Sequence, residues 1–246
     1  GFLRSRRAAK SPRLPEGIRI YAFGDIHGRA DLLAKMFLLI DADLANSPIE
    51  RPIEVYLGDY VDRGPYSCDT LNLLIERARS REMVFIKGNH EAYFLDVLRD
   101  PTRLGGWRQI GGLQTLMSYG IAPLLNPTPA EQTALIDALA DTMPSHHLPF
   151  LRNLRPSFTC GDFFFVHAGV RPGVPLAEQR TGDLRWIRES FLGSGNAHEA
   201  VIVHGHTITE GIELRPNRIG IDTGACFGGA LTCLVLEEDR LGFLAR

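Results

Sequence analysis

The stretch Gly24-Asp25-Ile26-His27-Gly28 comes directly after an apolar run, Ile18 to Phe23, that has the composition of a β-strand. The same arrangement occurs twice more: GDYVDRG at Gly58–Gly64 follows Ile53 to Leu57, and GNHE at Gly88–Glu91 follows Met83 to Ile86. Carboxylate, amide and imidazole side chains therefore recur where strands end. Because open α/β sheets bind ligands beyond the carboxyl ends of their strands, the pattern predicts a ligand site there.

Helical stripes of apolar residues separate these strands, one over Ala30 to Ala45 and another over Thr70 to Arg79. Strand–helix–strand units of this kind predict parallel strands with right-handed crossovers. Later apolar runs are short and lie between turn residues, which predicts strands, partly antiparallel, in a second sheet. These runs are Phe163 to Val166, Ala200 to Val203, Arg218 to Ile221 and Leu231 to Leu236.

A change of composition marks residues 101–150, where glycine pairs flank Trp107 and prolines follow. One helix, Pro129 to Asp141, is expected in this insertion, which we place as a cap beside the mouth of the site. Trp107 either lines the substrate groove or belongs to a small core of the cap. With 246 residues and 44% hydrophobic content, residues 17–246 are expected to form one domain with one large core.

Charge is distributed unevenly along the chain. Residues 1–13 hold five basic groups and no acid, and residues 14–246 carry 22 basic against 29 acidic groups. Residues 1–16 are therefore predicted to be a basic, disordered arm. An acidic body disfavours a nucleic-acid partner, and no stretch approaches the roughly 20 apolar residues that span a membrane. The cysteines lack metal-type spacing and are expected to be reduced thiols of a cytoplasmic protein: Cys68, Cys160, Cys226 and Cys233. Nothing in the sequence sets the oligomeric state.

The side chains at the strand ends form a mixed ligand set. Asp25, His27, Asp59 and Asn89 come from the three motifs, and two later runs end in imidazoles, at His167 and at His204-Gly205-His206. Mixed carboxylate, amide and imidazole ligands suit Mn²⁺, Fe or Zn²⁺ better than Ca²⁺. Two such cations that share a carboxylate activate water and clamp phosphoryl oxygens.

These motifs resemble those of a known family. GDxHG, GDxVDRG and GNHE, with His167-Ala168-Gly169 and His204-Gly205-His206-Thr207, are similar to the calcineurin-like metallophosphoesterases, and within them to the bacterial and phage type of phosphoprotein phosphatase. The resemblance runs from Arg19 to Val235 and includes the stretches Trp186–Glu189 and Ile221–Ala225. It implies an α/β fold: a metallophosphatase-type β-sandwich of two mixed sheets flanked by helices, with a helical or loop cap.

The resemblance also implies a centre of two divalent metal ions, with manganese as the first choice and iron or zinc as alternatives. Asp25 and His27 would bind the first ion, Asp59 would bridge both, and Asn89, His167 and His206 would hold the second. His204 has no ligand role in this subfamily, so it is either a hydrogen-bonded histidine at a strand end or an alternative ligand. Asp222 either orders a ligand histidine or caps a turn.

Catalytic roles follow from the same resemblance. His90 would protonate the leaving oxygen, with Asp62 bound to its other ring nitrogen. Arg63 and Arg188 would hold phosphoryl oxygens, with Arg185 as a competitor for the second position. The expected reaction is direct attack on phosphorus by a hydroxide held between the two ions, since the sequence contains neither a C-x5-R loop nor a P-loop.

The expected function is therefore that of a metal-dependent phosphomonoesterase, specifically a serine/threonine protein phosphatase whose partners are phosphoproteins or phosphopeptides. Two arginines favour a terminal monoester dianion, because it has three non-bridging oxygens. One alternative is a symmetrical dinucleoside polyphosphate hydrolase acting on diadenosine tetraphosphate, since such enzymes share the three N-terminal motifs. Another is a non-catalytic phosphate-binding scaffold, against which the complete set of ligands, His90 and Arg63 argue.

Overall fold

The computed structural model describes residues 11–244, so the expected basic arm lies outside the described residues over positions 1–10. Residues 11–16, also expected in the arm, instead contact the folded body. Leu14 is buried, and its N–H donates to the carbonyl of Glu238 at 2.9 Å. The fold thus begins ahead of residue 17, because an apolar side chain within the basic segment is buried in the core.

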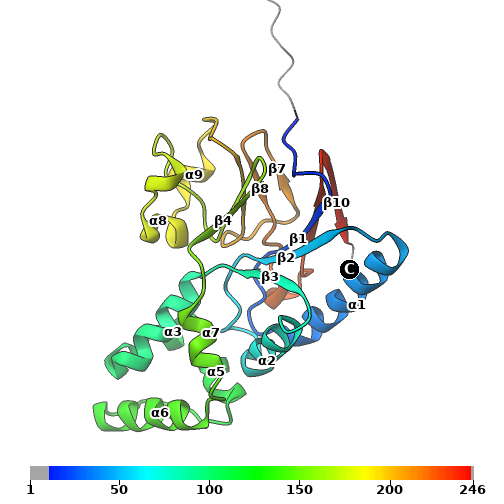
Figure 1. The fold of residues 1–246 in the computed structure, drawn as a ribbon. Helices are drawn as coiled ribbons and strands as arrows, with labels where there is room; N and C mark the ends of the chain where they lie inside the picture. The colour runs from blue at the N-terminus through cyan, green and yellow to red at the C-terminus, as the bar shows by residue number, and fades with distance from the viewer. Residues whose placement is uncertain (1–10, 245–246) are drawn as a thin grey trace, which may run out of the picture.

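The first sheet has the strand order β10-β9-β1-β2-β3 (Figure 1). Its strands are β1 (Ile18–Phe23), β2 (Arg51–Tyr56), β3 (Glu82–Phe85), β9 (Cys233–Glu237) and β10 (Arg240–Leu244). The first three are parallel, as the strand–helix–strand pattern predicts, and β9 is antiparallel to both β1 and β10.

The second sheet has the order β4-β5-β6-β8-β7. It consists of β4 (Ser157–Cys160), β5 (Phe163–Val166), β6 (Val201–His204), β7 (Glu213–Leu214) and β8 (Arg218–Gly220). The run Leu231 to Leu236, expected in this sheet, instead forms β9 of the first sheet. The expectation was wrong because an apolar run does not specify its partner, and β1 offered a second hydrogen-bonding edge opposite β2.

The two sheets pack face to face, and alternation along the strands places side chains in two cores. In β1, Ile20 and Ala22 point between the sheets, whereas Tyr21 and Phe23 point to the helices. Phe165 of β5 and Val203 of β6 complete the inner core from the other sheet. The expected class, a β-sandwich of two mixed sheets flanked by helices, is confirmed.

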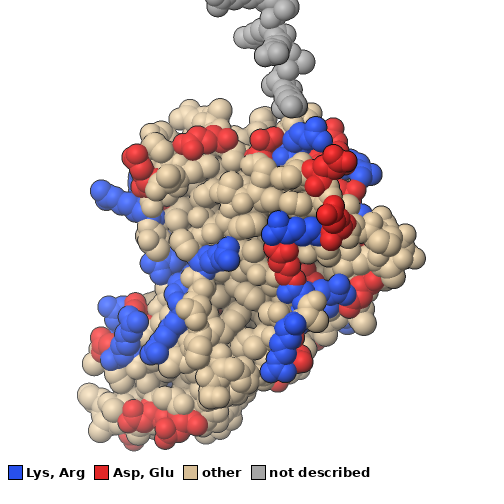
Figure 2. All heavy atoms as spheres, viewed as in Figure 1, with Lys and Arg blue, Asp and Glu red and all other residues tan. Residues whose placement is uncertain are grey.

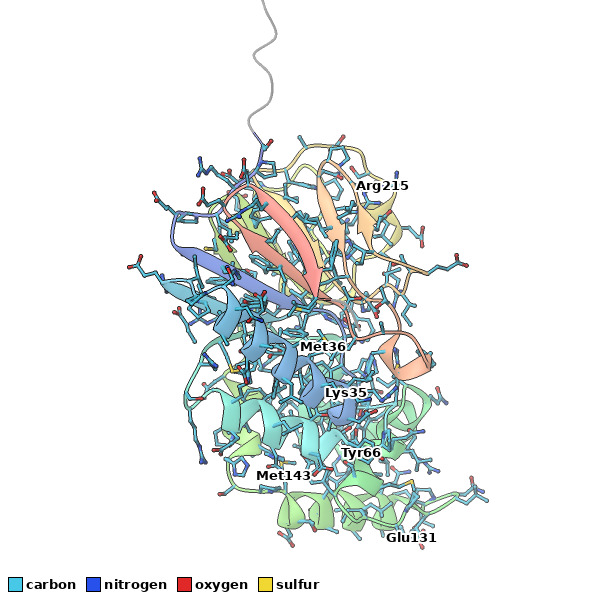
Figure 3. All side chains as sticks on the ribbon, turned by 90° about the vertical axis from the view of Figure 1, so that its right-hand side faces the viewer. Lys35, Met36, Tyr66, Glu131, Met143 and Arg215 are labelled. Atoms are coloured by element: carbon cyan, nitrogen blue, oxygen red, sulfur yellow. The ribbon has the colours of Figure 1, made fainter. Side chains whose placement is uncertain are left out.

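Helices cover both outer faces. The first sheet is covered by α1 (Ala30–Asn46), α2 (Ser67–Arg77) and α3 (Asn89–Arg99), and the second by the short α8 (Thr181–Trp186) and α9 (Glu189–Leu192). In α1, Leu33, Met36 and Ile40 recur at helical spacing and are buried. Figure 3 shows α1 and α2 lying beside each other, with Met36 labelled on α1.

The insertion folds into short helices: η1 (Pro101–Arg103), α4 (Leu104–Gln109), α5 (Gly112–Ser118), α6 (Pro129–Thr142) and α7 (His147–Arg152). The helix α6 matches the expected Pro129 to Asp141. It begins with a capping box in which Thr128 and Glu131 bond each other's backbone, followed by proline at the first turn. Its buried residues pack in the same core as α3, so the cap is continuous with the domain.

No helix within residues 11–244 is long and apolar enough to cross a membrane.

Candidate metal and phosphate site

The carboxylate of Asp59 lies at the centre of the candidate site. It follows β2, and its oxygens lie 3.5 Å from Nε2 of His27 and 3.4 Å from Nε2 of His167. Nε2 of His90 lies 3.8 Å from it. Loops after β1, β2 and β5 and the first turn of α3 therefore converge on one point, as the motif positions predict.

Backbone carbonyls fix which ring nitrogen faces inward. Nδ1 of His27 donates to the carbonyl of Val61 at 2.9 Å, and Nδ1 of His167 donates to that of Leu57 at 2.9 Å. Each ring therefore turns an Nε2 lone pair toward Asp59. Nε2 of His167 also faces Oδ1 of Asn89 at 2.8 Å. Two facing lone pairs repel each other, so this contact favours a cation nearby.

Burial keeps the imidazoles of His27 and His206 in their neutral, ligating form. It lowers the pKa of His27 to about 3 and that of His206 to about 2. Nε2 of His206 is buried and has no hydrogen-bond partner among the described residues. A buried polar atom without a partner is costly, and His206 lies in the same group of ligand residues as Asp59 and His167.

Two sets of ligand atoms each lie within 4.8 Å of one another: His27, Asp59 and His90, and then Asp59, His167 and His206. Asp59 belongs to both sets, so these residues fit a pair of divalent ions with one shared carboxylate. The first set contains His90, to which the family resemblance assigns the role of proton donor, and it does not contain Asp25. The carboxylate of Asp25 accepts from the N–H of His206 at 3.0 Å and lies 3.9 Å from Nε2 of His27, at the edge of the cluster.

Three buried carboxylates, those of Asp25, Asp59 and Asp222, lie at or beside the cluster. Burial, Asp222 and Asp59 raise the pKa of Asp25 well above its usual range. Burial alone would raise the pKa of Asp59, but the neighbouring histidines hold it well below its usual range. Buried carboxylates in this arrangement favour binding of cations.

His90 is held by Asp62, which lies 2.8 Å from its Nδ1. Burial lowers the pKa of His90, but Asp59 and Asp62 outweigh it and leave that pKa above its usual value. The cap fixes Asp62: the indole N–H of Trp107 donates to it at 2.9 Å, and the hydroxyl of Thr115 donates at 2.7 Å. Trp107 is fully buried, so it belongs to the core of the cap and does not line the groove.

Glu91 orders the loop that carries Asp59. Its buried carboxylate accepts from the N–H groups of Asp59, Tyr60 and Gly88 at 2.7 to 3.0 Å. Burial raises its pKa to about 7. Glu91 belongs to the GNHE motif, but no role was predicted from the sequence for Glu91 or for Thr115.

Left-handed backbone recurs at the site in residues other than glycine. The φ angles are +47° at His27, +52° at Asp59, +70° at Asp62, +68° at Arg63 and +65° at His206. Such conformations are uncommon for residues with a Cβ and gather at functional sites.

A cleft of about 750 Å³ opens beside this cluster. The cap lines one side with Arg108 to Gln114, as its expected position beside the mouth requires, and Arg63, Arg188 and His206 line the rest together with Phe227. Nη1 of Arg63 lies 3.0 Å from Nε2 of His27, and Arg188 bonds the hydroxyl of Thr207. Arg185 is absent from the lining and bonds the carbonyl of Thr181, which favours Arg188 as the second phosphate ligand.

His204 and Asp222 both lie outside the two ligand sets. The ring of His204 packs edge-on against Phe191, and its Nδ1 lies 3.1 Å from the carbonyl of Gly205, outside both ligand sets. Asp222 accepts from the N–H of Gly224 at 3.0 Å, which caps a turn, and its charge also acts on Asp25.

The chain matches the family model of the calcineurin-like phosphoesterases over residues 18–226. Because this match spans most of the chain and includes every strand-end motif, the protein belongs to that family and is a metallophosphoesterase.

Its relatives carry two kinds of name. The serine/threonine-protein phosphatase 1 of Salmonella typhimurium is 29% identical over 221 residues, which is 87% of this chain and 89% of that protein. The asymmetrical bis(5'-nucleosyl)-tetraphosphatase of Halalkalibacterium halodurans is 24% identical over 233 residues, with shares of 87% and 89%. A crystal structure provisionally assigned as a diadenosine tetraphosphatase is similar in fold, with a TM-score of 0.64 at 18% identity over 96% of this chain and 98% of that one.

Proposed function

We propose that this protein is a metal-dependent phosphomonoesterase that removes phosphate from serine and threonine residues of proteins. The observation that supports it most directly is the position of Asp59 in both ligand sets, between His27 and His167. That position suits a bridging carboxylate, and we assign Asp25, Asn89 and His206 as the remaining ligands.

Divalent ions held by these residues, with manganese as our first choice, supply an activated water and positive charge against the phosphoryl oxygens. The protein supplies the proton for the leaving group. Nδ1 of His90 donates to Asp62, which orients the ring so that Nε2 can give a proton to the leaving oxygen. Trp107 and Thr115 hold Asp62 still during this transfer.

Two guanidinium groups at the cleft suit a phosphate monoester. Arg63 and Arg188 both line the space beside His206, and each presents a planar fork of donors. A monoester dianion offers three terminal oxygens for these donors, whereas a diester offers two. Preorganised donors of this kind stabilise charge as it develops in the transition state.

A second candidate function is hydrolysis of dinucleoside polyphosphates. The cleft contains the exposed ring of Phe227, with the guanidinium of Arg63 at 5.6 Å from its centre, and a third arginine, Arg108. An exposed aromatic face suits a purine base, and a third cation suits a longer phosphate chain. The name of the Halalkalibacterium halodurans relative agrees with this alternative.

A parallel assay separates the two functions. The Mn²⁺-loaded protein is offered a phosphoserine peptide, diadenosine tetraphosphate and a simple phosphodiester under identical conditions. We expect the highest kcat/KM on the phosphopeptide and the lowest on the diester. A kcat/KM dominated by the tetraphosphate would replace our proposal with the second candidate. The variant Phe227→Ala is then expected to weaken the tetraphosphate reaction selectively.

A further inference from the structure

Five basic side chains outside the cleft form what we call the basic surface: Lys87, Arg99, Arg152, Arg155 and Arg185. Burial lowers the pKa of Lys87, and the charges of Arg185 and Arg99 lower it further, while that of the buried Glu91 raises it, so the two arginines are near enough to act on Lys87. The N–H of Lys87 bonds the carbonyl of Arg155 at 2.8 Å. Figure 2 shows basic side chains gathered where α3 and β4 adjoin, with acidic ones beside those over the far end of α3.

The charge of this surface is not neutralised. Among the ion pairs between residues 11 and 244, none includes a member of the basic surface. The described chain as a whole carries 22 basic and 29 acidic side chains, so the surface is a positive region on an acidic body. Such a region attracts carboxylates and orients an approaching acidic partner.

An apolar pocket of about 360 Å³ opens within the same surface, between α3, α6 and α7. Leu95, Leu98, Met143 and Leu148 contribute its apolar lining, and Met143 is labelled at the end of α6 in Figure 3. Arg99 and Arg152 line it as well, and the lining includes no acidic residue. An aliphatic side chain could therefore be buried between two guanidinium groups.

We propose that this pocket docks the phosphoprotein substrate, through a segment that has one aliphatic side chain next to acidic residues. The inference rests on the proposed phosphatase function and specifies its substrate class. A recess selects a protruding side chain, whereas binding to a lipid surface requires protruding apolar residues, and none of the pocket residues belongs to the large exposed hydrophobics. A nucleic acid would engage the arginines but has no aliphatic group for the recess.

The length of α3 sets a minimum spacing between the phosphorylated residue of the substrate and the side chain that enters the pocket. His90 lies in its first turn, and Leu95, Leu98 and Arg99 line the pocket toward its other end. At about 1.5 Å per helical residue, the pocket lies about 8 to 14 Å along the axis from His90. An extended peptide at about 3.3 Å per residue needs at least about three to four residues to span this distance.

The experiment compares two phosphoserine peptides of equal length with the Mn²⁺-loaded protein. One carries leucine and two glutamates at least four residues from the phosphoserine, and the other carries alanine and two glutamines there. We expect the first to have the lower KM. The double variant Arg99→Gln/Arg152→Gln is expected to raise that KM about fivefold, in line with the modest strength of exposed ion pairs, and to leave its kcat unchanged. The KM of the neutral peptide and the turnover of p-nitrophenyl phosphate should also stay unchanged.

A matched control removes the same charge elsewhere. Arg79 and Arg215 are exposed and pair with Glu76 and Glu213, so Arg79→Gln/Arg215→Gln should leave both KM values as they are. The variant Ala140→Glu places a carboxylate at the mouth of the pocket on an exposed position of α6, and it should raise the KM of the acidic peptide alone. Equal effects on both peptides, or no effect on either, would overturn the proposal.

Direct binding separates this proposal from the phosphatase assignment. Fluorescence anisotropy of the unphosphorylated leucine–glutamate peptide tests docking even if no phosphopeptide is hydrolysed. Binding that is lost in Arg99→Gln/Arg152→Gln supports the docking site, whatever the reaction. The same assay is run with single-stranded RNA and with vesicles that contain phosphatidylserine. If one of these binds through the two arginines and the peptide does not bind, the surface is assigned to that ligand instead.

Discussion

At the residue scale, Asp59 is the side chain on which the site depends most. It shares ligand sets with four imidazoles, so replacing its charge should weaken both sets at once. We expect Asp59→Asn, and likewise His206→Ala, to lose bound metal and to lose activity by more than about 100-fold, since even residues that only support metal ligands cost 10–100-fold. Metal content by elemental analysis, measured beside activity, tests this. Exposed Asp69→Asn is the control, and full activity in Asp59→Asn would contradict the bridged site.

Trp107 offers a second prediction at this scale. Trp107→Phe keeps the stacking on Phe94 but removes the N–H bound to Asp62. We expect kcat on a phosphoserine peptide to fall about tenfold, a part of what a general acid contributes, and to fall less on p-nitrophenyl phosphate, whose leaving group needs little protonation. The ratio of the two losses is the readout. Equal losses on both substrates would show that Trp107 acts on folding alone.

The sequence placed the individual site residues with uneven success. Asp25, His27, Asp59, Asn89, His167 and His206 were predicted from strand ends, and the structure brings them together, because the ends of neighbouring strands must meet. Arg188 could not be separated from Arg185 in the sequence, since residues three apart share a face of a helix. The helix α8 ends before Arg188, and this turns its side chain to the cleft. Their chemical roles stay predictions.

At the scale of elements, the cap contains a buried titratable group. His147 begins α7 and is fully buried; its Nδ1 lies 2.7 Å from the hydroxyl of Tyr119 and its Nε2 lies 2.9 Å from Oδ1 of Asn72. It thereby links the cap to α2. Its neighbour His146 is exposed, and the sequence of the dipeptide does not indicate which of the two rings is buried.

This histidine predicts a pH dependence of stability. Burial lowers the pKa of His147 to about 4, below the usual value of about 6.5. Between these values the unfolded chain binds a proton that the folded chain does not, so stability should fall as the pH falls from about 6.5 to 4. The slope from one proton cannot exceed about 1.4 kcal/mol per pH unit. Urea unfolding at several pH values should show a flatter profile for His147→Gln than for the unaltered protein; an identical slope in the two proteins would contradict it.

The bounds of helices and strands were predicted better than the pairing of the strands within the sheets. The strand β1 was predicted at its exact bounds, and the helix α6 ended one residue from its expected end. Local periodicity suffices for this. The pairing of β9 with β1 depends on which edge is free once the whole sheet has formed, and no local pattern carries that information.

At the scale of the whole molecule, Leu14 connects the N-terminal segment to the core between the sheets. We expect Leu14→Ala to lower the free energy of unfolding by about 2–4 kcal/mol, because it leaves a cavity. Leu125→Ala, at a position that is 84% exposed, is the control and should change it little. Denaturant unfolding measures both. A loss no larger than that of the control would show that residues 11–16 are not part of the cooperative fold.

The left-handed backbone at the site also has a consequence for how this protein tolerates change. Arg63 has φ of +68° and is only partly buried, so glycine there would adopt the same turn without steric cost. Arg63→Gly is therefore expected to raise the melting temperature while catalysis declines. A library screened only for survival of heat would enrich glycine at this codon, and a screen for turnover would remove it again.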